Sequence, residues 1–207
     1  MKRGLLSAWT ALVVGMGGVG AGFVVSAWVA TEARASVSLP ATWDGLLQES
    51  TAAAVMTPAE ARAVWENGRI YTYTRLTVDR AVTGDLAAGS SVWVRTMGGV
   101  VGKIGQIVEG EPVFSPGHAS LLFLHPGPTA GMFEVTARAQ GQFPVIVDDP
   151  QKLPHLVRSG AVGGLVPRSS APGAQAPPRL AADVVHGRAV DDVAQEIAAD
   201  WERTHRR

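Results

Sequence analysis

The sequence predicts a mainly β protein: a small antiparallel barrel or sandwich of the OB or netrin-like type, with a C-terminal amphipathic helix. Six or so short segments between residues 51 and 147 have strand patterns and are separated by turn residues. No helical pattern between them is long enough for the crossover that parallel strands need. Apolar residues at helical spacing then follow near the C-terminus.

Residues 1–35 have the pattern of a signal peptide. Two basic residues precede a stretch without charge from Gly4 to Thr31, and Ala33-Arg34-Ala35 supplies the small residues of a cleavage site. The apolar run is also long enough to span a bilayer, so an N-terminal membrane anchor is the alternative. We expect membrane contact only through residues 4–30, and only if this segment is not cleaved. We therefore expect an exported protein, located in the periplasm, the cell envelope or the extracellular space.

Residues 36–150 are expected to form the β-rich domain. Trp43, Leu46 and Leu47 predict a short helix at 42–50. A first strand is expected over 51–56, where Thr57-Pro58 interrupts it and a brief helical turn at 59–63 follows. The later strands are expected at 69–82, 91–96, 119–124, 132–137 and 142–147.

The C-terminal part of the chain is expected to contain a linker and a helix. Residues 151–188 are rich in Pro, Gly and Ala, which is typical of a mobile linker. Residues 189–207 hold the predicted helix, whose continuous stripe consists of Val190, Val193, Ala194, Ile197, Ala198 and Trp201.

Several short motifs resemble those of a set of uncharacterised exported bacterial β-domain proteins. They are Trp65-Glu66-Asn67-Gly68-Arg69-Ile70-Tyr71-Thr72, Val82-Thr83-Gly84, Thr96-Met97-Gly98-Gly99, Phe114-Ser115-Pro116-Gly117 and Gln140-Gly141-Gln142-Phe143. The resemblance covers residues 42–147 and the terminal helix. More distantly, the strand pattern resembles the netrin-like modules of tissue protease inhibitors, which are OB-type barrels. Those modules depend on cysteines and this chain has none, so the resemblance implies the fold but not the inhibitory mechanism.

Composition excludes several classes of function. The chain has 18 basic and 18 acidic residues, and removing residues 1–35 takes away three basic residues and one acidic residue. A near-neutral domain lacks the clustered basic face that nucleic acids need. Because there is no cysteine, disulfides, thiolate metal sites and a cysteine nucleophile are excluded.

The sequence shows no assembled catalytic or metal-binding motif. The five histidines have no helical i, i+4 pair and H-E-x-x-H is absent, so no metal site is expected. G-x-S-x-G and the P-loop pattern are also absent, so we expect no cofactor and assign no catalytic residue. We expect a non-catalytic binding or interaction module whose partner is a protein, a peptide or a glycan. Two alternatives stay open: a hydrolytic enzyme with a site near the Gly98–Gly105 loop and His118, and an envelope-anchored structural protein.

The candidate ligand-binding residues are aromatic and basic side chains on the polar sides of two strands. Tyr71, Tyr73 and Trp93 form an aromatic patch with Arg75 and Arg95 if the two strands are neighbours. On an OB-type barrel such a face binds sugars, peptides or single strands. His118, before a buried strand, is expected at the rim of the domain. The alternative is that the terminal helix covers this face and packs Trp201 on it.

Overall fold

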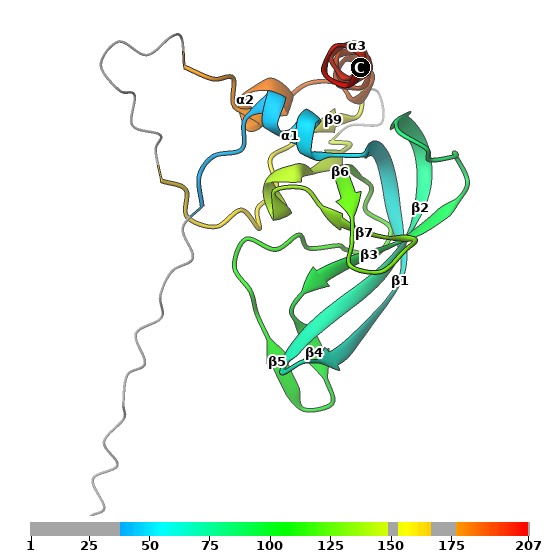
Figure 1. Cartoon of the computed structure of the whole chain (residues 1–207), viewed down its shortest axis with the longest axis vertical. Helices are drawn as coiled ribbons and strands as arrows, with labels where there is room; N and C mark the ends of the chain where they lie inside the picture. Colours follow the sequence, from blue (N-terminus) through cyan, green and yellow to red (C-terminus); the bar gives the residue numbers. More distant parts are fainter. Residues whose placement is uncertain (1–37, 149–152, 167–176, 207) are drawn as a thin grey trace, which may run out of the picture. The chain divides into compact units, whose positions relative to one another are not determined.

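The computed structural model of the chain describes residues 38–148, 153–166 and 177–206 (Figure 1). They belong to one compact unit. The predicted signal peptide or anchor at 1–35 lies outside the described residues. Within the described ranges, no helix has the length and apolar character that crossing a membrane requires.

Five strands form a barrel-like ring. β1 (Ala52–Glu66), β2 (Arg69–Thr83), β3 (Ser91–Met97), β7 (Met132–Val135) and β6 (Ser120–Pro126) are neighbours in that order, and β6 pairs back onto β1. Every pairing in the ring is antiparallel except that of β3 with β7, which joins the two strands over two residue pairs and leaves the ring incompletely closed. This is the partly open arrangement of an OB-type barrel, and it confirms the predicted fold class.

The remaining strands extend the ring or stand beside it. β8 (Gln142–Ile146) pairs with β6, and β9 (His155–Leu156) pairs with β8. β4 (Gly99–Val101) and β5 (Ile104–Gln106) form a separate hairpin. A short 3-10 helix, η1 (Arg138–Gly141), joins β7 to β8.

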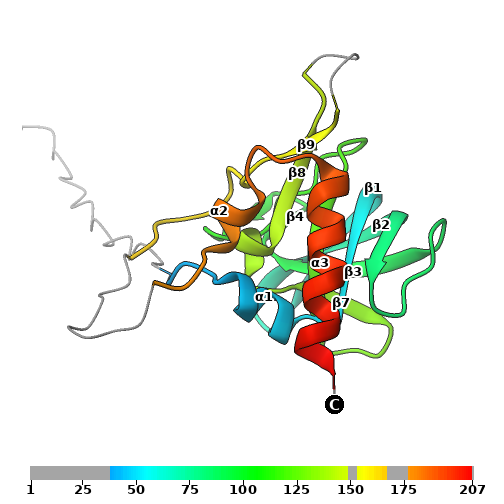
Figure 2. The same cartoon turned by 90° about the horizontal axis from the view of Figure 1, so that it is seen from above.

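Three helices pack on one outer side of the ring. α1 (Trp43–Glu49), α2 (Ala181–Val185) and α3 (Val190–His205) bury their apolar residues against the outer faces of β1, β6 and β8. Figure 2 shows α3 lying beside α1. The terminal helix therefore packs on its own domain.

The strand β6 separates two hydrophobic cores. Leu121 and Phe123 face the helices, whereas Leu122 and Leu124 face the inside of the barrel. Alternate residues of a strand point to opposite faces, so a strand with a core on each side needs a continuous apolar run. The inner core consists of Ala54, Met56, Leu76, Val78, Val94, Leu122, Leu124 and Val135.

The first strand is longer than the sequence predicts. β1 does not end at Met56 but continues to Glu66, so the predicted helical turn at 59–63 is wrong. The pairing of β1 with β2 changes register between Pro58 and Glu60, and this irregularity accommodates the proline. Beyond it the two strands pair as far as Glu66 and Arg69, which holds residues 59–63 extended.

The linker prediction for residues 151–188 is also wrong in the described part of that range. It contains β9 and α2, and the four apolar side chains Leu156, Ala181, Val184 and Val185 are buried in the helix-side core. A small number of apolar residues is enough to hold a Gly- and Pro-rich stretch on the domain when each of them is buried in the core. In α3, Ala198 is exposed although the predicted stripe includes it, and Asp200 is buried instead.

An ion-pair cluster attaches the segment around α2 to α3. Glu196 accepts hydrogen bonds from Arg179 and Arg188, each at 2.6 Å. The hydrogen bonds to Arg179 and Arg188 lower the pKa of Glu196 from its ordinary value of 4.5. A carboxylate whose pKa is lower in the folded than in the unfolded chain stabilises the fold at any pH above its pKa in the unfolded chain. This contribution is lost as the pH falls through the pKa of the folded chain.

We expect Glu196→Gln to lower the free energy of unfolding by about 1 kcal/mol at neutral pH. The difference from the unaltered chain should shrink as the pH falls below 4.5. Urea unfolding followed by circular dichroism, at neutral and at acidic pH, measures it. Glu202→Gln is the control, since Glu202 lies 3.8 Å from Arg206 with both side chains exposed. A Glu196→Gln cost that does not change with pH would contradict this account.

Candidate functional site

The outer face of β2 and β3 brings five of the six predicted site residues together. Tyr71, Tyr73 and Arg75 alternate along β2, and they pair across the strands with Met97, Arg95 and Trp93 respectively. Residues directly opposite each other in an antiparallel pair lie on the same face of the sheet. The aromatic and basic side chains therefore form one surface, as the alternation predicts.

The terminal helix does not cover this face. Trp201 packs against the core between the helices and β1, β6 and β8, and its ring stacks on His205 with 4.0 Å between centroids. The alternative that the terminal helix and Trp201 cover the aromatic face is therefore wrong. The reason is that α3, together with α1 and α2, packs its apolar stripe on the outer faces of β1, β6 and β8.

Arg95 lies at the centre of the face. Its guanidinium lies over the ring of Tyr71, 4.5 Å from the centroid, and donates to Glu134 Oε1 at 2.6 and 2.8 Å. Burial disfavours the charge of Arg95, but the hydrogen bond and the charge of Glu134 outweigh it and raise the arginine pKa. Arg95 is thus a fixed, charged donor group stacked on an aromatic ring.

Tyr73 is held next to this group by a second carboxylate. Its hydroxyl donates to Glu66 Oε1 at 2.6 Å, and the other oxygen of Glu66 lies 3.9 Å from Arg95 Nη1. Burial and the hydrogen bond to Glu66 raise the pKa of Tyr73, so the hydroxyl stays protonated at neutral pH. Donors and acceptors alternate over the face as a result.

A polar pocket of about 320 Å³ lies where this face meets η1. Tyr71, Arg95, His125, Glu134, Glu111 and Arg138 are among its lining residues. Arg138 Nε and Glu111 Oε1 are 3.0 Å apart, and Glu111 Oε2 accepts a hydrogen bond from the backbone of Met97. His125 Nε2 lies 3.6 Å from Glu134. Each arginine in the pocket is accompanied by a carboxylate, so the pocket is polar without a large excess of either charge.

The backbone at the edge of the pocket is strained. Ala137 and Arg138 have φ values of 54° and 56°, in the left-handed region that side chains other than glycine rarely adopt. The backbone N–H of Ala139 donates to the carbonyl of Gly110 at 2.9 Å, and the ion pair with Glu111 holds the side chain of Arg138, the residue before it. Strain of this kind persists where the surroundings fix it, and it often marks a ligand site.

Trp93 and Arg75 lie further along the same face. Arg75 pairs with Glu60 at 2.9 Å, with both side chains substantially exposed. Trp93 is 37% exposed and is available for stacking. These two residues extend the surface away from the pocket.

The Gly98–Gly105 loop and His118 are not part of one site. The loop forms the β4–β5 hairpin, and His118 is absent from the lining of the pocket beside that hairpin. His118 is exposed in the turn before β6, at the opposite end of that strand from His125. The predicted hydrolytic site is therefore not assembled. No group of three or more histidines and carboxylates suited to a metal ion occurs in the described ranges.

Five residues of the site were not predicted from the sequence: Glu66, Glu111, His125, Glu134 and Arg138. Glu134 was detectable, because it stands between Phe133 and Val135 in an alternating strand and so points away from the core. Glu111 lies in a loop and Arg138 begins the short 3-10 helix η1, and in neither place does periodicity give a direction. Their partnership depends on the register of β3 with β7 and on the path of η1.

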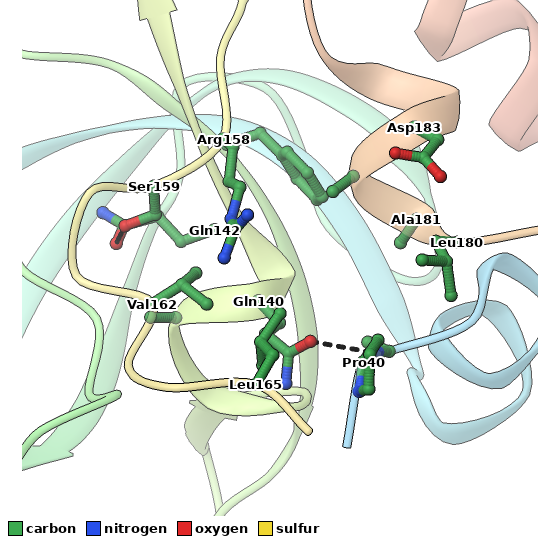
Figure 3. Close-up of a pocket in the computed structure, with 14 residues that line it drawn as sticks. Pro40, Gln140, Gln142, Arg158, Ser159, Val162, Leu165, Leu180, Ala181 and Asp183 are labelled. Atoms are coloured by element: carbon green, nitrogen blue, oxygen red, sulfur yellow. Dashed lines mark hydrogen bonds between the residues drawn. The ribbon is translucent and has the colours of Figure 1, made fainter. Parts of the chain in front are cut away.

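A smaller cavity of about 100 Å³ lies next to α2 (Figure 3). Gln140 projects toward the segment at Pro40, and its Oε1 accepts a hydrogen bond from the backbone of Ala41 at 2.7 Å. Gln142 hydrogen-bonds the backbone of Val113 through both ends of its amide. These polar groups tie segments together, and the pocket on the β2–β3 face offers more room and more polar side chains.

Comparison of the chain with protein-family models, with curated proteins and with solved structures found no match. The resemblance to exported bacterial β-domain proteins and to netrin-like modules therefore stays a prediction. Function has to be inferred from the geometry of the face itself.

Proposed function

We propose that the chain is a non-catalytic binding module that holds a neutral glycan on the outer face of β2, β3 and β7. The observation that supports this most is the stack of Arg95 on Tyr71, with Glu134 and Glu66 fixed on either side of the arginine. Sugar hydroxyls both donate and accept hydrogen bonds, and a sugar ring has an apolar face. A surface with paired donors and acceptors next to aromatic rings suits both properties.

Charge favours a neutral ligand over a nucleic acid. A phosphate approaching Arg95 meets the carboxylates of Glu134 and Glu66, and Arg138 is accompanied by Glu111 in the same way. A nucleic-acid site needs cations that are free to replace counterions. We also propose that the module is exported, because of the signal-peptide pattern at residues 1–35.

We expect Arg95→Ala to weaken glycan binding about tenfold or more, because it removes the central donor and the arginine partner of Glu134. A printed array of neutral oligosaccharides identifies a bound glycan, and calorimetry with that glycan measures the dissociation constant of the full chain and of each variant. Arg80→Ala is the matched control, since Arg80 is also on β2 in an ion pair, with Asp191 of α3.

Two results would count against the proposal. If the unaltered chain binds no glycan on the array, the ligand class is wrong. If Arg95→Ala and Arg80→Ala bind a glycan equally well, the binding surface is elsewhere.

A further inference from the structure

One end of the domain exposes several large apolar side chains together. It is formed by the turn between β1 and β2 and by the β4–β5 hairpin (Figure 1). Its exposed apolar residues are Trp65, Val100, Ile104 and Ile107, and Ile107 is 99% exposed. We call these four residues the apolar tip. Exposed apolar groups gathered in one place mark a contact surface.

Hydrogen bonds hold the two parts of the tip together. The backbone of Ile70 donates to Gln106 Oε1 at 2.9 Å and accepts from the backbone of Gly98 at 2.7 Å. Thr72 donates through its hydroxyl to the carbonyl of Gly98 at 2.7 Å. The hairpin is therefore fixed to the end of the β1–β2 arm, and its exposed side chains keep their place relative to Trp65.

A pocket of about 500 Å³ opens beside the tip. Val100 and Ile107 belong to its lining, together with apolar side chains such as Met97, Val108 and Phe114. The hydroxyl-bearing residues Thr72, Thr74 and Thr96 also line it. The solvent-exposed apolar surface at this end of the domain therefore continues from the tip into the pocket.

Two exposed cations flank the tip. Arg69, the first residue of β2, and Lys103, in the turn of the β4–β5 hairpin, are exposed. Neither forms an ion pair with a carboxylate in the part of the chain that the structure describes, and Arg69 Nη1 lies 4.0 Å from the sulfur of Met97. Two of the nearby carboxylates are engaged on the polar face, where Glu66 pairs with Tyr73 and Glu111 pairs with Arg138, and Glu109 is exposed two residues after Ile107. Apolar side chains flanked by exposed cations without a carboxylate partner are complementary to a bilayer with anionic headgroups.

We propose that the apolar tip docks on the surface of a lipid bilayer that contains anionic lipids. Trp65 takes the interfacial position that tryptophan prefers, the aliphatic side chains enter the headgroup boundary, and Arg69 and Lys103 meet the lipid phosphates. This contact is distinct from any membrane contact through residues 4–30, and it does not depend on the proposed glycan site.

Because the chain has no cysteine, single cysteines can report this contact in the full chain. We would place an environment-sensitive fluorophore at Ile104→Cys or Ile107→Cys, and at the controls Val147→Cys or Leu153→Cys, which are exposed apolar positions near β8 and β9. The probes are vesicles of phosphatidylcholine with and without phosphatidylglycerol, each carrying a lipid-bound quencher.

With phosphatidylglycerol present, we expect a blue shift and quenching at residues 104 and 107 that are several-fold larger than at 147 and 153. Arg69→Glu with Lys103→Glu should remove most of this difference. Comparing positions within the same bound chain separates the tip from adsorption through residues 1–35. Equal quenching at all four positions, or none at 104 and 107, would overturn the proposal. A shift without vesicles that grows with protein concentration would overturn it in favour of a protein partner.

Discussion

Trp43→Ala is expected to lower the free energy of unfolding by about 5 kcal/mol. Trp43 is completely buried, and its ring meets Phe123 edge to face with 5.9 Å between centroids. Replacing a buried tryptophan with alanine leaves a large cavity and costs about 3–5 kcal/mol. The value should be at the upper end, because Trp43 Nε1 also donates to the buried carboxylate of Asp200 at 2.7 Å.

The expected loss is comparable with the whole stability of many domains, so part of the Trp43→Ala protein should be unfolded at 37 °C. Trp43→Phe is the matched control, since it keeps an aromatic ring and removes the N–H donor, at a cost of about 1–3 kcal/mol. Urea unfolding followed by far-ultraviolet circular dichroism measures both. Equal costs for the two variants would show that the hydrogen bond to Asp200, and not the packing of the ring, dominates at this position.

Gly84→Ala should destabilise the fold by about 3 kcal/mol, and Gly89→Ala by about 1 kcal/mol. The two glycines have nearly the same conformation, with φ values of 80° and 78°. A Cβ on Gly84 would lie 2.4 Å from the carbonyl oxygen of Thr51, whereas a Cβ on Gly89 meets nothing within 4 Å. Both alanines are strained, and Gly84→Ala must also push apart the end of β2 and the start of β1.

Thermal unfolding measures the difference in stability between the two variants. For a chain of this length we expect the midpoint to fall by about 9 °C for Gly84→Ala and about 3 °C for Gly89→Ala. The difference between them measures the steric contact with Thr51 alone, since the backbone cost is shared. Equal shifts would mean that β1 moves away from Gly84 at little cost.

The strands that the sequence predicts well are those whose pattern matches a single local environment. The alternation through Tyr71 and Tyr73 predicts β2 because one face of β2 is buried and the other is not. The unbroken run of Leu121, Leu122, Phe123 and Leu124 predicts a strand buried on both sides, and β6 has a core on each side. Local periodicity was sufficient in both cases.

The errors lie where long-range pairing overrides local preference. Pro58 interrupts a strand locally, yet pairing with β2 carries β1 past it through an irregular register. The stretch with β9 and α2 has the composition of a linker, and its order depends on where a few apolar residues such as Leu156 and Val185 meet the core. No local pattern contains that information.

The candidate site was predictable to the extent that it lies on regular strands. The shared face of Tyr71, Tyr73 and Arg95 follows from alternation in two neighbouring strands. The residues that complete it come from β1, β6, β7, η1 and the loop at Glu111, and their position depends on how the barrel closes. The strained backbone at Ala137 and Arg138 has no sequence signal either, since neither residue is glycine or asparagine.

The most direct test of the proposed binding face maps the bound ligand onto the domain by nuclear magnetic resonance. The isotope-labelled full chain is titrated with the oligosaccharide that the array identifies, and amide shifts are followed. We expect the largest changes at Tyr71, Arg95, Glu134 and Arg138, and none in α1 or α3. Changes confined to the helices or to the β4–β5 hairpin would contradict the assignment of the β2–β3 face as the binding surface.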